Sequence, residues 1–318
     1  MKRDIFGIHF AAFLFGMTGI LGTVIDADSN VITFGRALFA VLALTPILIW
    51  RSHRLHTPDK PRIPGTPSTP PTDTINEVPT ARSLTWRYLA SGILLAVHWV
   101  TFFVSVKTGG VAIATLGFSS FAAFITLIEW CIIRVFSGSG IAISRSDWIR
   151  TIVVTAGLAL ITPTLELADE ATYGFIMGLI SGLSFAAMAV FNSRLLATVN
   201  PIRVARNQNV VVALVMAAFA LPMLDAASAV SWFWLAVLGV FCTGLSHALF
   251  VSSLKKLRVN VAGLVIALEP VYAIAAAWLL FAEVPGVRTI VGGVIIIGAI
   301  LGVSYTKAKP VEQHPTAR

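Results

Sequence analysis

Charged residues and cysteines are scarce in this chain of 318 residues. Asp, Glu, Lys and Arg together make up 12% of it, whereas about 25% is usual for a soluble domain. The two cysteines, Cys131 and Cys242, both lie inside apolar runs, so they predict neither a disulfide framework nor a metal site. A composition this poor in charge excludes an ordinary soluble domain.

Motifs of nucleotide-driven and catalytic proteins are missing as well. The chain holds no GxxxxGK(S/T) loop, which argues against energy from nucleotide hydrolysis within it. HExxH, CxxC and GxSxG are absent, and no polar stretch is long enough for a catalytic domain. We therefore expect no enzyme, no catalytic residue, no cofactor and no metal.

Long hydrophobic runs recur instead from one end of the chain to the other. Hydrophobic residues make up 57% of it, and the mean hydropathy is +0.85. An apolar helix of about 20 residues crosses a bilayer. Lys2 and Arg3 precede the first run as in a signal peptide, but no small-residue cleavage site follows, so we interpret it as a retained span. The prediction is an all-α polytopic membrane protein with ten transmembrane helices, at residues 5–25, 31–50, 84–105, 110–133, 148–165, 172–192, 204–224, 231–253, 260–282 and 286–305.

The segment between the second and third spans, residues 51–83, differs from the other connections in length and composition. It holds seven prolines among serines and threonines. Such a composition cannot bury a core, so it predicts a disordered or polyproline-like loop. A tolerated insertion and a partner-binding segment are the two interpretations of it.

Basic and acidic residues alternate between successive connecting segments. Lys and Arg dominate before the first span and after the second, fourth, sixth, eighth and tenth. The other segments carry Asp26, Asp28, Glu166, Asp169, Glu170, Asp225 and Glu283, with Lys107 and Arg288. Short cytoplasmic segments collect Lys and Arg, so both termini are predicted to be cytoplasmic. The net charge of +8 then reflects orientation in the lipid bilayer, and no nucleic acid partner is expected.

The two halves of the chain share a series of short matches in the same order. Each half has five predicted spans, and five is odd, so the second half must enter the membrane from the opposite side. The prediction is two inverted five-helix repeats, residues 1–167 and 168–306, followed by a cytoplasmic tail, 307–318. In such proteins substrate binds near the midplane, between the halves. The matches are Asn30-x5-Arg36 with Asn200-x5-Arg206, His98 with His247, Val111-Ala112 with Val261-Ala262, and Arg150-Thr-Ile-Val with Arg288-Thr-Ile-Val.

Glu269 and Pro270 are the first candidate site residues, because they interrupt the apolar run 261–283. A charge at that depth costs at least ~2.5 kcal/mol, and proline breaks the helical hydrogen bonding. Glu269 is predicted to carry protons or recognise a cation in a cavity. The alternative is a structural carboxylate bonded to the backbone that the kink frees.

Histidine and aromatic residues give further candidates. His98 and Trp99 lie near the middle of the third span, and His247 is the repeat partner of His98. Tyr272 follows Glu269 by three residues, so both can face one side of a helix. Each is predicted to line a substrate cavity, with a packed and hydrogen-bonded side chain as the alternative.

The fourth predicted span adds Ser119, Ser120 and Glu129. The serines could bind substrate or bond back to helix carbonyls. Glu129 could serve the cavity or pair with Arg134 near the cytoplasmic interface. Gly174-x3-Gly178-x3-Gly182 in the sixth span predicts close helix packing, either within the chain or in a homodimer.

Two basic residues near the predicted outer side are candidates for gating or structural roles. Arg36 lies six residues into the second span and could snorkel outward to headgroups or to Asp26 and Asp28. Lys107 lies in the short turn between the third and fourth spans, as a gate or an interfacial lysine.

The ten-span 5+5 pattern, Arg36, and the run LEPVYAIAAAWLLFAE followed by Gly292-Gly293-x4-Gly298 resemble the EamA-type transporters of the drug/metabolite transporter superfamily. Similar proteins are mostly bacterial plasma-membrane exporters of amino acids, metabolites or drugs, and some import vitamins such as riboflavin. The resemblance implies a central cavity lined by spans one, three, four, six, eight and nine. Ser119-Ser120 stand where the second half has Glu269-Pro270, and no glutamate of the first half matches Glu283.

The functional prediction is a secondary active transporter of the bacterial inner membrane that exports a small amino acid-like compound or drug by alternating access. Protons are the predicted coupling ion, and the small-molecule substrate is the main partner. An importer of a vitamin or nutrient such as riboflavin is the alternative within this class. A membrane-embedded enzyme and a non-transporting membrane scaffold are the alternatives from other classes.

Overall fold

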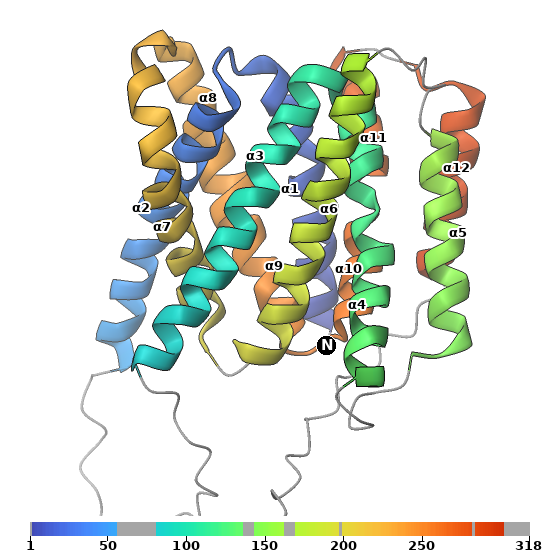
Figure 1. The fold of residues 1–318 in the computed structure, drawn as a ribbon, viewed down its shortest axis with the longest axis horizontal. Coiled ribbons are helices and arrows are strands. Elements are labelled where there is room, and N and C mark those ends of the chain that lie inside the picture. The colour runs from blue at the N-terminus through green and yellow to red at the C-terminus, as the bar shows by residue number, and fades with distance from the viewer. Residues whose placement is uncertain are drawn as a thin grey trace, which may run out of the picture.

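The protein is a bundle of roughly parallel helices (Figure 1). The computed structural model describes residues 2–55, 81–135, 143–161, 169–196, 199–281 and 284–301. Most of the predicted loop 51–83, Glu283 and the predicted tail 307–318 lie outside the described residues. The first half holds α1 (Lys2–Val24), α2 (Ser29–Leu55), α3 (Ala81–Ser119), α4 (Phe121–Val135) and α5 (Arg145–Ile161). The second half holds α6 (Asp169–Leu195), α7 (Pro201–Ala220), η1 (Leu221–Ala226), α8 (Ala229–Gly239), η2 (Val240–Leu245), α9 (Ser246–Leu254), α10 (Val259–Ile266), α11 (Glu269–Phe281) and α12 (Val287–Leu301).

The predicted fold class is confirmed: the chain is an all-α, multi-pass membrane protein. Within the described residues, eight helical stretches are long and apolar enough to span a bilayer. The two remaining predicted spans correspond to α5 and α12, which have 17 and 15 described residues. These two helices stand next to each other at one side of the bundle (Figure 1).

The helical stretches depart from straight rods at several places. Gly110, with φ +79°, lets the chain reverse between the third and fourth predicted spans. The fourth span then breaks at Ser120, between α3 and α4, and the ninth breaks between α10 and α11, just before Glu269-Pro270. Pro270 sits in the first turn of α11, where a missing backbone N–H costs little.

Glycines bring α6 unusually close to α3. A Cβ on Gly178 would lie 2.9 Å from the Gly117 Cα, and one on Gly174 would lie 2.9 Å from the Gly109 Cα. A Cβ on Gly182 would lie 2.6 Å from the Ser120 Oγ. The glycine face of α6 is therefore occupied by α3 and its neighbour, so packing within the chain accounts for this motif.

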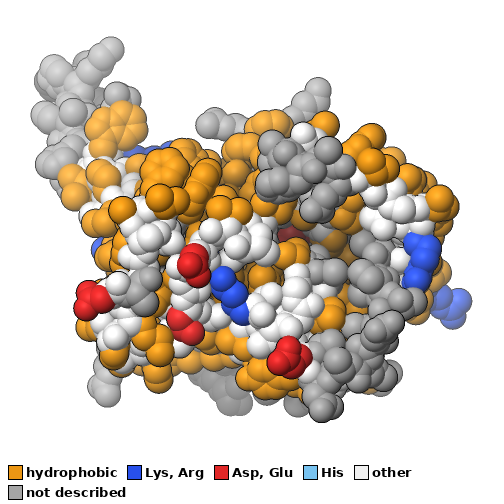
Figure 2. All heavy atoms as spheres, turned by 90° about the horizontal axis from the view of Figure 1, so that it is seen from above, with side chains coloured by type: hydrophobic (Ala, Val, Ile, Leu, Met, Phe, Trp, Pro, Cys, Tyr) orange, Lys and Arg blue, Asp and Glu red, His pale blue; other side chains and the backbone are white. Residues whose placement is uncertain are grey.

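The outer surface of the bundle is rich in large apolar side chains, as a lipid-facing surface requires. Leu279 is 82% exposed, Val287 77% and Leu214 71%. Figure 2 shows one end of the bundle, where hydrophobic side chains occupy most of the rim and charged side chains are few and scattered. The charged residues Arg36 and Glu269, by contrast, are buried in the interior, at the site described next.

Candidate substrate cavity

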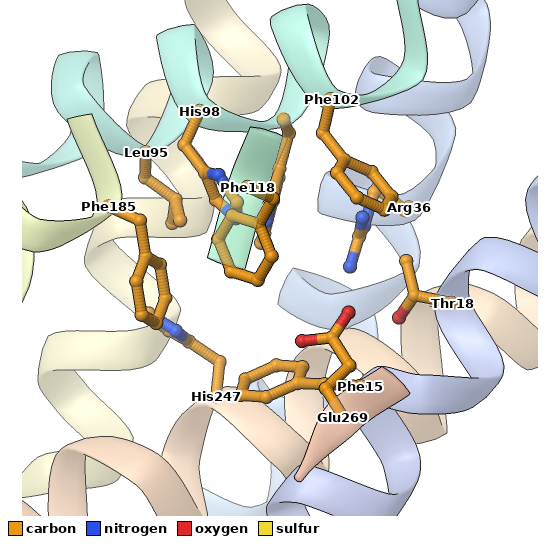
Figure 3. A pocket seen from close by; sticks show the side chains of 11 residues that line it. Phe15, Thr18, Arg36, Leu95, His98, Phe102, Phe118, Phe185, His247 and Glu269 are labelled. Carbon is orange, nitrogen blue, oxygen red and sulfur yellow. The ribbon is translucent and has the colours of Figure 1, made fainter. Parts of the chain in front are cut away.

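A small buried cavity lies at the centre of the bundle. Its volume is about 20 Å³, which holds about one water molecule. Helices of both halves line it: α1, α2 and α3 from the first, α6, α9 and α11 from the second. The side chains that line it are Phe15, Thr18, Arg36, Leu95, His98, Trp99, Phe102, Phe118, Phe185, His247 and Glu269 (Figure 3).

Arg36 is fully buried and faces this cavity, with 1% of its surface exposed. Its Nε donates to the Thr243 Oγ1 at 2.8 Å, and its Nη2 donates to the Cys242 carbonyl at 3.4 Å. The guanidinium lies over the Trp99 ring, 4.1 Å from the centroid, a geometry that stabilises a desolvated cation by ~2 kcal/mol. These contacts hold the charge inside, so the expectation that Arg36 snorkels outward to headgroups or to Asp26 and Asp28 is wrong.

The partner of Arg36 is an irregular stretch of the second half. Residues Val240–Leu245 form a π-helical turn, and π-bulges often mark functional sites. The turn can press against α2 because Gly239 has no side chain: a Cβ there would lie 2.8 Å from the Arg36 carbonyl oxygen. The π-turn and the glycine contact together place Thr243 and Cys242 at the guanidinium.

Glu269 enters the cavity from the start of α11. It is 6% exposed, and Figure 3 shows its carboxylate pointing into the same space as the Arg36 guanidinium. Among the described residues, none donates a hydrogen bond to this carboxylate or forms an ion pair with it. The arrangement therefore differs from a structural carboxylate bonded to freed backbone. Gly16 of α1 permits the approach, because a Cβ there would lie 2.8 Å from the Glu269 carbonyl oxygen.

The two predicted histidines both line the cavity, and each is held by a polar partner on another helix. The His98 Nδ1 lies 2.8 Å from the Ser181 Oγ on α6. The His247 Nε2 lies 2.8 Å from the Gln208 Oε1 on α7. Both are almost fully buried, so the partners remove the cost of an unsatisfied ring nitrogen.

Aromatic rings form most of the remaining wall. Phe118 stacks on His98 with a centroid separation of 5.0 Å and an interplanar angle of 29°. Phe185 contacts His98 and Phe118, and Trp99 lies edge-on to His247. A wall of this kind favours a solute with an apolar or aromatic part.

Thr18 adds a second polar group that lacks a partner. Its Oγ1 is buried and makes no hydrogen bond to any described residue. It lies on α1, next to the Glu269 carboxylate in Figure 3. A buried hydroxyl without a partner costs about 1–3 kcal/mol, so this position is suited to a water or solute.

Several predicted site residues lie outside the cavity lining. The Ser119 and Ser120 hydroxyls bond back to the carbonyls of Thr115 and Gly117, both at 2.6 Å, which is the second of the two interpretations. The Tyr272 hydroxyl lies 3.5 Å from the His9 Nδ1, at the α1–α11 contact.

The charged candidates near the helix ends also have local partners. The Glu129 Oε1 accepts from the Arg194 Nη2 of α6 at 2.7 Å, so the structure pairs it with Arg194; the Arg134 side chain lies outside the described residues. Lys107 donates to the Ile25 carbonyl at 3.0 Å, which ties α3, just before its reversal at Gly110, to the residue that follows α1.

The sequence did not single out the lining residues Phe15, Thr18, Leu95, Phe102, Phe118 and Phe185, or the supporting residues Gln208, Asn192 and Thr243. Phenylalanine is common in every span, so periodicity gave no signal for the lining residues. A buried amide such as Gln208 in an apolar span was a usable signal, because polar groups within a membrane need partners. Among the described residues, no group of three His, Cys, Asp or Glu could hold a metal ion.

Comparison with known proteins agrees with this architecture. Residues 172–305 match the EamA-like transporter family. An uncharacterized transporter of Archaeoglobus fulgidus is 29% identical over 142 residues, which is 45% of this chain and half of that relative's length. A solved crystal structure with 16% identity superposes over 92% of this chain and 93% of its own, with a TM-score of 0.66, which supports the fold. The match agrees with the resemblance drawn from the sequence: residues 172–305 of this chain are similar to the EamA-like transporter family.

Proposed function

We propose that this protein is a secondary transporter that carries a small amphipathic solute through the central cavity by alternating access. The observation that carries the proposal is that Arg36 and Glu269, which carry opposite charges, line one buried aromatic cavity. Two opposite charges at that depth are costly without a function. The matched family and the transporter relative point in the same direction.

The packing of the helices supports the proposed inverted repeat, residues 1–167 and 168–306. α1 contacts α9, α10 and α11, and its counterpart α6 contacts α3 and α4. α2 packs on α7, and α5 packs on α12. Breaks in the fourth and ninth spans lie at matching places, Ser120 and the residues before Glu269. Rocking of the two halves about the cavity is the proposed transport motion.

The size of the cavity implies a closed conformation. A volume of about 20 Å³ is far below the about 300–1,000 Å³ of small-molecule sites. A metabolite therefore enters only after helices separate. Opening to one side of the membrane at a time is the proposed way in which the solute then crosses.

The lining favours a zwitterionic, amino acid-like solute with an apolar or aromatic side chain. Arg36 and Glu269 offer one charge of each sign, so a zwitterion leaves the cavity balanced. Phe118, Phe185 and Trp99 offer apolar contact. Glu269 is the proposed proton carrier, and export is the proposed direction. Import of a vitamin or nutrient is the alternative within this class. The residues that line the cavity give no support to a scaffold role.

The proposed location is the bacterial inner membrane, with both termini in the cytoplasm. The connection between α9 and α10 carries three basic residues, Lys255, Lys256 and Arg258. Asp225 lies in η1, which follows α7, just after the seventh predicted span. The positive-inside tendency then places the α9–α10 connection inside and Asp225 outside.

The test is metabolite profiling of cells with and without the expressed chain, at two external pH values. Intracellular and extracellular pools of small metabolites are compared with those of cells that express Glu269→Gln at equal abundance. An exporter raises specific extracellular pools, and Glu269→Gln abolishes their dependence on external pH. Identical pools with and without the chain would rule out transport, and a pH dependence unchanged in Glu269→Gln would rule out the coupling role.

A further inference from the structure

A chain of buried amides leads from α6 to the cavity histidine. The Gln208 Nε2 donates to the Asn192 Oδ1 at 2.7 Å, and the Gln208 Oε1 lies 2.8 Å from the His247 Nε2. The Asn192 Nδ2 donates to the Met188 sulfur at 3.4 Å. Asn192 is 2% exposed and Gln208 is fully buried. Two amides at that depth have a cost that their mutual hydrogen bond only partly offsets, so their placement calls for a reason.

The Met188 sulfur, at one end of this series of hydrogen bonds, fixes the direction of every hydrogen bond in the series. A thioether accepts but cannot donate, so the Asn192 amide nitrogen faces Met188 and its oxygen faces Gln208. The Gln208 nitrogen must then face Asn192, which leaves its oxygen toward His247. An amide oxygen needs a donor, so the His247 Nε2 carries the proton. The opposite arrangement would set the Asn192 oxygen against the sulfur, two acceptors in contact.

The other ring nitrogen of His247 is then an acceptor. None of the described residues donates to the Nδ1, and His247 lines the cavity together with Glu269 and Thr18. The carboxylate also lacks a donor among the described residues. The cavity therefore has unmet acceptors that a solute bearing N–H groups can satisfy.

We infer that Asn192 and Gln208 are positioning residues that hold His247 as a hydrogen-bond acceptor for an N–H group of the solute. The recognition step rests on the proposed function, whereas the protonation pattern does not. Solutes with an unsubstituted ammonium group are preferred over solutes of equal charge that lack N–H. The preference depends on amides that lie outside the cavity lining.

The protonation pattern is tested by ¹⁵N NMR of the full-length protein in lipid nanodiscs, labelled at its six histidines. His247→Gln identifies the His247 signals. The wild type should show a protonated Nε2 and a bare Nδ1. Gln208→Leu should mix the two neutral forms, and Asn192→Leu offers a second route if that variant does not fold. Asn209→Ala is the matched control, because within the described residues this buried amide of the same helix bonds only back to the Ala205 carbonyl. A wild type protonated on Nδ1, or variants that keep the wild-type signals, would overturn the inference.

The recognition step is tested with two probes of the same charges, L-phenylalanine and its N,N,N-trimethyl betaine. Binding is followed by tryptophan fluorescence, since Trp99 lines the cavity. The wild type should prefer the amino acid by about three- to tenfold, the range of one hydrogen bond, and this ratio should shrink in Gln208→Leu but not in Asn209→Ala. A ratio unchanged in Gln208→Leu, with the NMR pattern as predicted, would sink the recognition role alone. An NMR pattern as predicted with no binding of either probe would instead count against the proposed function.

Discussion

Alanine at Gly178 should loosen the contact between α6 and α3. A Cβ at this position would lie 2.9 Å from the Gly117 Cα and 3.3 Å from the Ala114 carbonyl oxygen. Carbon atoms pack at about 3.5–4.0 Å, so the two backbones must separate by about 0.6 Å or more. Both partners are backbone atoms, and no flexible side chain can give way.

The expected loss of stability in Gly178→Ala is estimated against a matched control, Gly298→Ala. Gly298 of α12 has open space around its Cβ position: apart from the neighbouring turns of α12, no atom of the described residues lies within 4 Å. Replacing glycine by alanine inside a helix gains about 1 kcal/mol in helix propensity at either site, and this gain cancels in the comparison. Overpacking costs about 1–3 kcal/mol. Gly178→Ala should therefore be less stable than Gly298→Ala by about 1–3 kcal/mol.

The assay is reversible unfolding of the purified protein in mixed micelles, with increasing denaturing detergent and circular dichroism as the readout. The free energy of unfolding is compared between the two variants under the same conditions. A Gly178→Ala protein as stable as Gly298→Ala would refute the α3–α6 register, and the position of Phe118 and Phe185 in the cavity would fall with it.

Two further predictions concern polar contacts. Thr243→Val removes the acceptor of the Arg36 Nε while keeping the side-chain shape, and should cost about 1.5–3 kcal/mol in the same unfolding assay; Thr243→Ser keeps the hydroxyl and should cost clearly less, so equal losses would argue against this bond. Asp147 lies just before the predicted span 148–165. Its burial opposes ionisation, but hydrogen bonds from Ser144 and the charge of Arg258 outweigh the effect of burial. The pKa of Asp147 is therefore lowered below 3.8. A lowered folded-state pKa gives stability that is complete well above 3.8 and is lost as the pH falls through the folded value. Asp147→Asn should therefore be less stable than wild type near neutral pH, with a gap that narrows below about pH 3.8; a gap that stays constant with pH would contradict the ion pair.

The ten predicted spans could be identified from the sequence because apolar length and charge alternation are local signals. Each predicted span has a helical counterpart in the described residues, including the two that consist of shorter helices. The break before Glu269-Pro270 was also predictable, since proline and a carboxylate in an apolar run leave few other solutions. The proposed repeat supplied His247 as a candidate once His98 was chosen.

Side-chain partners that lie far apart in the sequence could not be predicted in the same way. Arg36 and Thr243 are 207 residues apart, and no spacing rule shows that a π-turn of η2 meets α2. Without knowledge of that partner, the sequence favoured an Arg36 side chain that reaches outward and keeps its charge at the headgroups. The partner of Glu129 could not be predicted for the same reason, because Arg194 lies on another helix. Phe118 could not be separated from the many other phenylalanines of the spans.

The central claim is that the cavity opens alternately to the two sides of the membrane. The most direct measurement is thiol labelling of Thr18→Cys in a background where Cys131 and Cys242 are replaced. Right-side-out and inside-out vesicles are treated with a membrane-impermeant reagent, and Asp225→Cys and Lys256→Cys serve as controls that should each react from one side only. Thr18 is 5% exposed in the closed conformation, so labelling requires opening. The account predicts labelling of Thr18→Cys from both sides. Labelling from one side only, or from neither, would contradict it.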